Sequence, residues 1–452
     1  MTKKSKKLIF TDIVIIIALA IAIGISMTKS FDIELSLGLC YYVNEDGERV
    51  DADSKNAPLG VEGSGELKVH FVNVRQGDCI VIELPDGKNM IIDGADKKDH
   101  HRTAAMDFIA KTLPDLDYFD YAILTHADAD HCGSLDDILN KYPAYTVYRP
   151  NVLLKRDDYA DPAADKLLPY YGTATTEAYR DFLKAAYTPT APHEFTPEVI
   201  VTDATDDSQT IKGGEGEYAY SLTFYSPLYA SGKKYADANN YSSIMLLEYR
   251  GFKFMLSGDA EQLNEQEFVA KVNSAKTDGV TDKYDVFDDN FNADVIKAGH
   301  HGSATSSTQA YLDAITTESG AASSYYVFSC DKTDSNKYDH PKQEVLDRLT
   351  AMGVPESNML RTDIVGDISF SVREDDGEFK LFYGDTATAP SEPTAPTPQE
   401  PEEEQVLTLE YMHLGGIKLT WALVAWTVYA VVVAALLVHI AYIYMHGRGK
   451  KK

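Results

Sequence analysis

The sequence predicts a mixed α/β domain flanked by two membrane-spanning helices. Short apolar runs of about four to eight residues, the length of buried strands, recur through the middle of the chain. Two runs of about 20 apolar residues or more, enough to cross a bilayer as helices, lie near the ends. With 452 residues, 44% hydrophobic and 25% charged, the chain can bury a sizeable core in one large or two ordinary domains.

The two expected spans are residues 8–27 and 419–445. Aromatic residues near both ends of the second span suit the two membrane interfaces. Basic residues precede the first span and follow the second, so both termini are expected in the cytoplasm of a bacterial cell and the middle outside the cell membrane. A cleaved signal peptide is the alternative for the first span, and it would leave the topology of the middle unchanged.

Composition sets the remaining boundaries. We expect a stalk at 28–63, a folded domain at 64–385 with an insertion at about 150–220, and a Pro- and Glu-rich linker at 386–414, with short basic segments at 1–7 and 446–452. Helices are predicted at Thr176–Ala186 and Gln343–Met352. Strands are predicted at Leu67–Val74, Cys79–Leu84, Asn89–Asp93, Tyr121–Leu124, Ser221–Tyr225, Ser243–Tyr249, Lys253–Leu256, Ala293–Ala298 and Ser324–Ser329.

The chain is strongly acidic, with a formal net charge of −28, and many of its basic residues lie beside the two spans. An acidic surface repels polyanions, and extended nucleic-acid binding requires Lys and Arg contacts to phosphates. No stable nucleic-acid complex is therefore expected. The four cysteines are scattered along the chain without a Cys-x-x-Cys pair, so they do not form a disulfide framework.

The strongest chemical signal is Thr125–His131, directly after a predicted strand. It holds His126, Asp128, Asp130 and His131. Two imidazoles and two carboxylates in a loop can converge on one or two metal ions. A solvated acidic turn is the alternative, and it is disfavoured because matching ligand types occur downstream.

Those downstream residues are Asp259 in Ser257–Ala260, and His300 and His301 in Gly299–Ser303. In each case a predicted strand leads into a Gly, which permits a sharp turn, and then into a ligand-type residue. Alone, Asp259 could cap a helix and His301 could be a surface residue. Together the clusters predict a metal site.

These motifs resemble the metallo-β-lactamase superfamily and, within it, the hydrolase domain of the competence DNA-uptake channel ComEC. The resemblance runs from about Leu67 to about Val372, and the channel's many membrane helices are absent, so DNA transport is not implied. The matching stretches are Val72–Asp78, Ile91–Gly94, Thr125–His131, Asn240–Ser243, Ser257–Ala260 and Gly299–Ser303, with looser matches at Tyr338–Pro341 and Arg361–Asp363.

The resemblance implies a four-layer αββα sandwich with two Zn²⁺ ions at one edge, or Mn²⁺ as the alternative. His126 and Asp128 would hold one ion, Asp130 and His131 the other, and Asp259 would bridge them. Either His300 or His301 would complete the second site, and His300 is the assigned ligand. The superfamily has a further His before the bridging Asp; here Asp237, Asn239 or Asn240 would replace it, or the first ion would be held weakly.

The implied reaction is attack of a metal-activated hydroxide on phosphorus or a carbonyl carbon. Asp130 would orient the nucleophile, and His301 and His340 would donate a proton to the leaving group. Asp78 and Asp93 are expected to fix loops beneath the site.

The function expected is a membrane-integral, extracytoplasmic phosphodiesterase acting on nucleic acid or on a phosphorylated envelope polymer or headgroup. The acidic charge favours a small or partly cationic substrate. The alternatives are a lactam, lactone or thioester hydrolase and a catalytically weak binding domain.

Overall fold

The computed structural model describes residues 64–188, 195–278, 281–331, 338–375 and 377–383, and short strands near both ends. The chain divides into two units. One is Leu59–Glu392, and the other combines Met1–Pro58 with Pro393–Lys452. This second unit contains two antiparallel strand pairs, β1 (Tyr41–Val43) with β2 (Arg49–Asp51) and β20 (Tyr411–Leu414) with β21 (Ile417–Thr420).

The expected spans lie outside the described residues, except for Leu419 and Thr420, which belong to β21. In the part of the chain that the structure describes, no helix is both long and apolar enough to cross a membrane.

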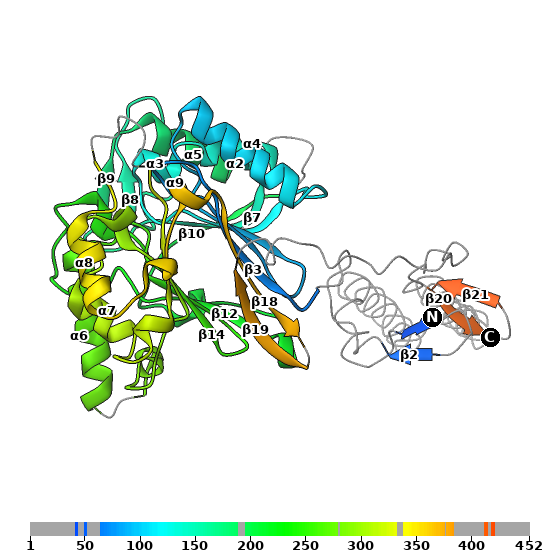
Figure 1. The fold of residues 1–452 in the computed structure, drawn as a ribbon. Helices are drawn as coiled ribbons and strands as arrows, with labels where there is room; N and C mark the ends of the chain where they lie inside the picture. The colour runs from blue at the N-terminus through cyan, green and yellow to red at the C-terminus, as the bar shows by residue number, and fades with distance from the viewer. Residues whose placement is uncertain are drawn as a thin grey trace, which may run out of the picture. The chain divides into compact units, whose positions relative to one another are not determined.

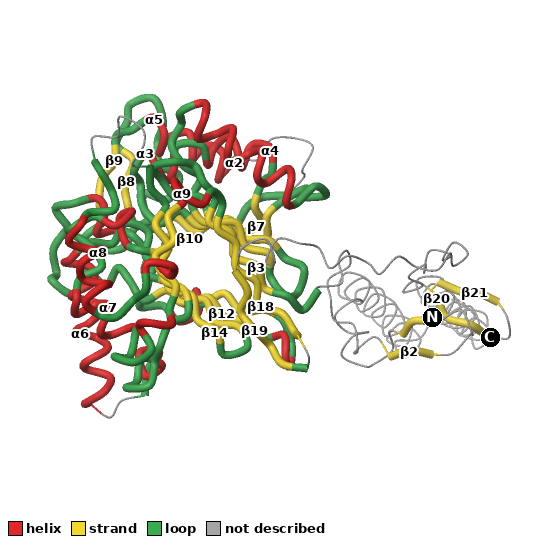
Figure 2. Tube along the Cα trace, in the orientation of Figure 1, coloured by secondary structure: helices red, strands yellow, loops and turns green. Residues whose placement is uncertain are grey.

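Two β-sheets pack face to face in the unit Leu59–Glu392, with helices on both outer faces (Figures 1 and 2). The first sheet has eight strands in the order β10-β7-β6-β5-β4-β3-β18-β19. Their bounds are β3 Leu67–Phe71, β4 Ile80–Glu83, β5 Asn89–Ile92, β6 Phe119–Ile123, β7 Ala144–Arg149, β10 Glu198–Val201, β18 Ile368–Asp375 and β19 Glu378–Tyr383. Strands β5, β6, β7 and β10 are parallel neighbours, and the pairs β3–β4, β4–β5, β3–β18 and β18–β19 are antiparallel.

The second sheet has seven strands in the order β11-β12-β13-β14-β15-β16-β17. Their bounds are β11 Ile211–Gly213, β12 Tyr220–Phe224, β13 Met245–Tyr249, β14 Phe252–Leu256, β15 Val295–Lys297, β16 Tyr325–Phe328 and β17 Met359–Arg361. Strands β14 to β17 are parallel, with Met255 of β14 opposite Ile296 of β15. A separate parallel pair joins β8 (Val152–Leu154) to β9 (Gly172–Ala174).

Helices cover the outer face of each sheet. The helices near the first sheet are α2 (Asp99–Thr112), α3 (Ala129–Cys132), α4 (Leu135–Lys141) and α5 (Glu177–Tyr187), and those on the second are α6 (Gln262–Asp278), α7 (Gln309–Ile315) and α8 (Gln343–Ala351), with a short α9 (Thr362–Val365) after β17 (Figure 1). Helix α5 begins after Thr176, whose side chain accepts a hydrogen bond from the Tyr179 backbone N–H. Both predicted helices are therefore present, at α5 and α8.

Alternating side chains along each strand build three apolar layers. In β4, Val81 packs toward the helices of the first sheet, and Ile80 and Ile82 pack between the sheets. This follows from the two-residue period of a strand. On the outer face of the second sheet, Phe268 of α6 and Leu312 of α7 form the third layer. The predicted four-layer αββα fold is confirmed for this unit.

Candidate metal centre

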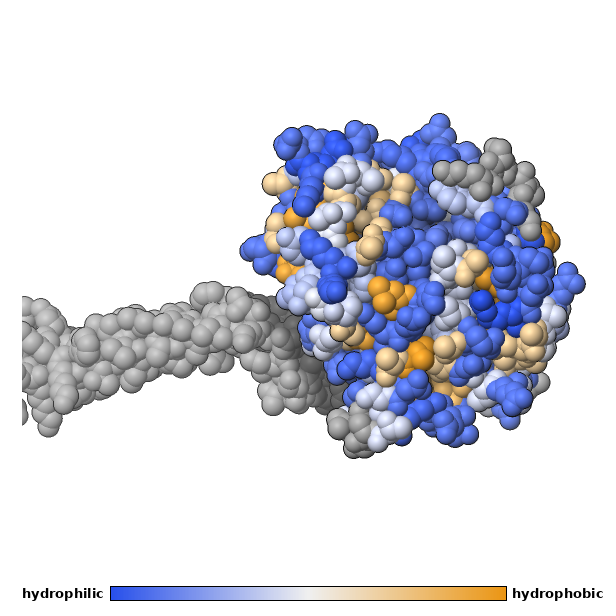
Figure 3. Space-filling model, turned by 90° about the vertical axis from the view of Figure 1, so that its left-hand side faces the viewer, coloured by the Kyte–Doolittle hydropathy of each residue, from blue (hydrophilic) through white to orange (hydrophobic). Residues whose placement is uncertain are grey.

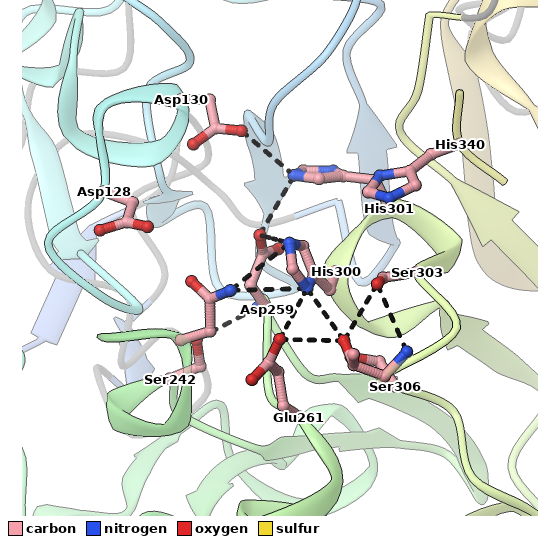
Figure 4. Close-up of polar contacts among 12 residues, drawn as sticks. Asp128, Asp130, Ser242, Asp259, Glu261, His300, His301, Ser303, Ser306 and His340 are labelled. Carbon is pink, nitrogen blue, oxygen red and sulfur yellow. Dashed lines mark hydrogen bonds and ion pairs between the residues drawn. The ribbon is translucent and has the colours of Figure 1, made fainter. Parts of the chain in front are cut away.

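Four ligand-type side chains meet where β6, β14 and β15 end, from the segments that follow these strands. They are Asp130, His131, Asp259 and His301, and their ligand atoms all lie within 4.8 Å of one another. The His131 Nε2 atom lies 3.1 Å from Asp259 Oδ1. The His301 Nε2 atom lies 3.3 Å from Asp259 Oδ2 and 3.5 Å from Asp130 Oδ2 (Figure 4). We call these four residues the ligand cluster.

Several buried atoms at this position make no hydrogen bond within the described residues. They include Nε2 of His131, Nε2 of His301 and Oδ1 of Asp259. Buried polar atoms normally have partners, so atoms left without them require an explanation. Imidazole nitrogens and carboxylate oxygens that face one another suit a divalent ion such as Zn²⁺ or Mn²⁺. The ligand cluster therefore fits the metal that its residue types predict.

The charges of the ligand cluster point the same way. Burial alone would raise the pKa of Asp259, but His131 and His301 hold that pKa well below its usual range. Burial alone would lower the pKa of each imidazole, but the Asp259 carboxylate raises both pKa values well above the usual range. The carboxylates thus require positive charge here, and either protons on the imidazoles or a divalent cation can provide it.

His126 and Asp128 lie beside the ligand cluster and form a smaller pair. The His126 ring is fully buried, with its centroid 4.2 Å from that of His131 and its Nε2 atom 3.9 Å from Asp128 Oδ2. Burial, with the charge of His131, lowers the pKa of His126 to about 4, so its imidazole is neutral at pH 7 and able to act as a ligand. Burial and the nearby Asp130 raise the pKa of Asp128 to about 6.

A carboxylate beneath the cluster orients His131. Asp93 accepts hydrogen bonds from Nδ1 of His131 at 2.7 Å and from the backbone N–H and hydroxyl of Thr125 at 2.8 and 2.7 Å. Because a carboxylate oxygen accepts this hydrogen bond, the imidazole donates its Nδ1 proton, and Nε2, which faces Asp259, is the atom that would bind an ion. This contact agrees with the supporting position expected for Asp93.

A strained turn separates the two adjacent histidines. His300 and His301 have φ values of 49° and 55°, in the left-handed region that L-residues rarely adopt. The turn directs the His301 ring into the ligand cluster and leaves His300 at its edge, with Nε2 3.8 Å from Asp259 Oδ2 and Nδ1 3.3 Å from Glu261 Oε1 (Figure 4). Of the two candidates, the geometry therefore places His301 in the ligand cluster and the assigned His300 beside it. Residue spacing does not reveal which way each ring faces in such a turn.

The remaining predicted residues surround His300. The His340 ring is buried, with its centroid 5.5 Å from that of His300 and 6.3 Å from that of His301. Burial, together with His301 and His300, lowers the pKa of His340 to about 4. The Asn239 amide nitrogen lies 3.4 Å from Nε2 of His300, and the Asn240 amide donates to Glu261.

Asp237 accepts a hydrogen bond from the Asn239 backbone N–H at the start of the short helix η4 (Ala238–Tyr241). Within the described residues, Asp237 is not part of the ligand cluster.

Two charged residues at the centre were missed by the sequence analysis. Glu261 follows Asp259 by two positions and contacts His300. Lys297 ends β15, is fully buried and pairs with Asp78. A signal for Lys297 existed, since it is a charged residue inside a predicted apolar strand.

Comparison with known proteins agrees with this site. Residues 72–228 match the family model described as the metallo-beta-lactamase superfamily. This match agrees with the αββα fold and with the ligand cluster, so the described domain resembles the metallo-β-lactamase superfamily in sequence, fold and ligand types. The chain resembles ComEC-like proteins of that superfamily.

Two competence proteins are similar to the chain in sequence. The chain is 24% identical over 332 residues to ComE operon protein 3 of Bacillus subtilis, covering 71% of this chain and 35% of that protein. It is 30% identical over 142 residues to competence protein ComA of Neisseria gonorrhoeae, covering 31% of this chain and 17% of that protein. The chain thus spans about a third or less of the length of these relatives.

Solved structures that match include the metallo-beta-lactamase fold protein YhfI of Bacillus subtilis, with 10% identity, 65% of this chain and 95% of that chain covered, and a TM-score of 0.30. The metallo-beta-lactamase GOB-18 of Elizabethkingia meningoseptica matches with 15% identity, 49% and 73% coverage, and a TM-score of 0.27.

Proposed function

We propose that this chain is a metal-dependent phosphodiesterase. The observation that carries the proposal is the position of Asp259 between two imidazoles, with Oδ1 toward His131 and Oδ2 toward His301. Asp128 and Asp130 add two more carboxylates beside it. Two divalent ions held by three carboxylates retain one positive charge in excess, which complements the single negative charge of a phosphodiester.

Divalent ions bound here would lower the pKa of a water molecule and stabilise negative charge on the substrate oxygens. His301 takes the ligand role in this proposal. Asp130 is partly exposed and sits at the border between the ligand cluster and solvent, where it can orient the attacking water. His300, held by Glu261, is the side chain placed to deliver a proton to the leaving oxygen. His340, the other predicted donor, lies beside His300, but its lowered pKa leaves it neutral near pH 7.

The acidic surface favours a short or partly cationic phosphodiester over a long polyanion. The face in Figure 3 is mainly hydrophilic, with only separated apolar patches. Together with the net charge of −28, this supports a nucleic-acid end or a phosphorylated envelope polymer or headgroup as substrate.

We also propose that residues 8–27 and 419–445 anchor the domain outside the cell membrane. Support comes from the basic residues at both chain ends. Protease treatment of spheroplasts tests this topology. Cleavage of the domain from outside is expected, and a domain protected until the cells are lysed would contradict it.

The decisive assay for activity compares the full chain with Asp259→Ala on bis(4-nitrophenyl) phosphate and on a cephalosporin, with Zn²⁺ or Mn²⁺ added. Phosphodiester hydrolysis that falls at least about 100-fold in Asp259→Ala is expected, since losing a central charge-stabilising group has effects of this size. Asp313→Ala, at an exposed carboxylate on α7, is the matched control and should retain activity. Faster cephalosporin hydrolysis would favour lactam chemistry instead.

A further inference from the structure

A buried lysine lies directly beneath the ligand cluster. Lys297 is the last residue of β15, and its side chain is fully buried. Its Nζ atom lies 2.9 Å from Asp78 Oδ2 and donates a hydrogen bond to the Ala298 carbonyl at 3.0 Å. Removing an ammonium group from water is costly, and an apolar side chain would complete the apolar strand more cheaply. Packing alone therefore does not explain why a charged lysine is buried at position 297.

Asp78 connects this lysine to a ligand. The carboxylate is fully buried, and its Oδ1 atom lies 3.5 Å from Nδ1 of His301. The other ring nitrogen of His301 faces Asp130 and Asp259. The Lys297 ammonium, the Asp78 carboxylate and the His301 imidazole thus follow one another in space, and His301 belongs to the ligand cluster. Asp78 lies where it can fix the orientation of the imidazole.

The lysine also supplies positive charge to a second group of ligand-type side chains, which includes two carboxylates. Asp78, Asp93 and His131 have ligand atoms within 4.8 Å of one another, so these residues could attract a cation themselves. Asp93 is satisfied by Thr125 and His131. Asp78 instead lies between the Lys297 ammonium, 2.9 Å from its Oδ2 atom, and the His301 ring, 3.5 Å from its Oδ1 atom.

We propose that Lys297 is a positioning residue of the metal centre: its ammonium group holds Asp78 in place beneath His301 and thereby keeps Nε2 of that imidazole directed at the bound ion. The inference rests on the metal binding in the proposed function and is independent of which substrate is hydrolysed. Lys297 acts through Asp78 and touches neither ion nor substrate.

Zinc affinity of the purified full chain, measured by competition with a chromogenic chelator, tests this role. Asp78→Asn and Lys297→Met should each weaken Zn²⁺ binding roughly 10- to 100-fold, the usual effect of removing a group that orients a ligand. Because Lys297 acts through Asp78, the double variant should bind Zn²⁺ within about threefold of Asp78→Asn, as expected for coupled residues. Where Lys297→Met alone does not fold, Lys297→Gln, which keeps a donor for the Ala298 carbonyl but removes the charge beside Asp78, is expected to show the same loss.

The matched control is Lys283→Met, which removes another largely buried lysine, one that donates to the Phe224 carbonyl at 2.8 Å and pairs with Asp207 at 3.3 Å. It should lower stability and leave Zn²⁺ affinity unchanged. Lys297→Met with wild-type affinity, or a double variant whose losses multiply, would overturn the inference while leaving the proposed function intact. A wild-type chain that binds no Zn²⁺ would instead overturn the proposed metal chemistry.

Discussion

Replacing Asp93 with Asn tests whether the hydrogen bond from His131 to Asp93 orients His131 for metal binding. The Asp93 carboxylate receives three hydrogen bonds, and the substitution preserves its shape while converting one acceptor oxygen into an NH₂ donor. With Oδ1 kept for the Thr125 backbone N–H, the new donor faces Nδ1 of His131. The neutral imidazole that a metal requires would then keep its proton on Nε2, so that nitrogen would have no lone pair to offer an ion.

The expected loss in Zn²⁺ affinity is roughly 10- to 100-fold, or about 1.4–2.7 kcal/mol. With the metal chelated, the mismatched buried donor should also lower the free energy of unfolding by about 1–3 kcal/mol. Chelator competition measures the first quantity and urea unfolding the second. Asp120→Asn is the control, since Asp120 also accepts a backbone N–H, from Asn89, but from within β6. Wild-type Zn²⁺ affinity in Asp93→Asn would refute this explanation of the geometry.

Three further predictions concern stability. Burial raises the pKa of Glu265 to about 7, so its contribution to stability is full below about pH 4.5 and is lost as pH rises through 7, by up to about 3 kcal/mol. Unfolding curves of Glu265→Gln measured across this pH range should lack the loss. Stability that depends on pH in the same way in both proteins would contradict the prediction. Gly302→Ala places a Cβ 2.6 Å from Pro341 Cβ at φ +88°, so a fall in melting temperature is expected, and an unchanged value would show that the turn adapts. Zn²⁺ at about 100 times its Kd should stabilise the folded chain by about 2.7 kcal/mol, as measured by calorimetry. Asp259→Ala should show no such stabilisation. Equal stabilisation of that variant would mean that the ion binds elsewhere.

Strands β3 to β6 and β12 to β16 could be predicted because their side chains alternate or are continuously apolar, and the other strands of the two sheets, β7, β10, β11, β17, β18 and β19, were missed. Helix α6 was missed for the opposite reason. Its buried positions include the polar Asn264 and Glu265 beside Phe268 and Val272, so no apolar stripe marks it. Asn264 is held by Asn240 and Ser242, and Glu265 by the backbone of Ser307 and Thr308, and sequence periodicity does not reveal such contacts.

At the site, the residue types were predictable and their orientations were not. Asp259 and His131 were grouped from motif chemistry, and they lie in contact in the fold. The directions of His300 and His301 depend on two successive left-handed residues, which no spacing rule encodes. Lys297 escaped notice because its partner, Asp78, is more than 200 positions away in the chain.

X-ray diffraction from crystals of the zinc-soaked chain, recorded on both sides of the zinc absorption edge, tests the central claim most directly. The account predicts an anomalous peak about 2.0–2.2 Å from ligand atoms of Asp130, His131, Asp259 and His301. A fully soaked crystal with no peak among these four side chains, or with its strongest peak at another place on the domain, would contradict it.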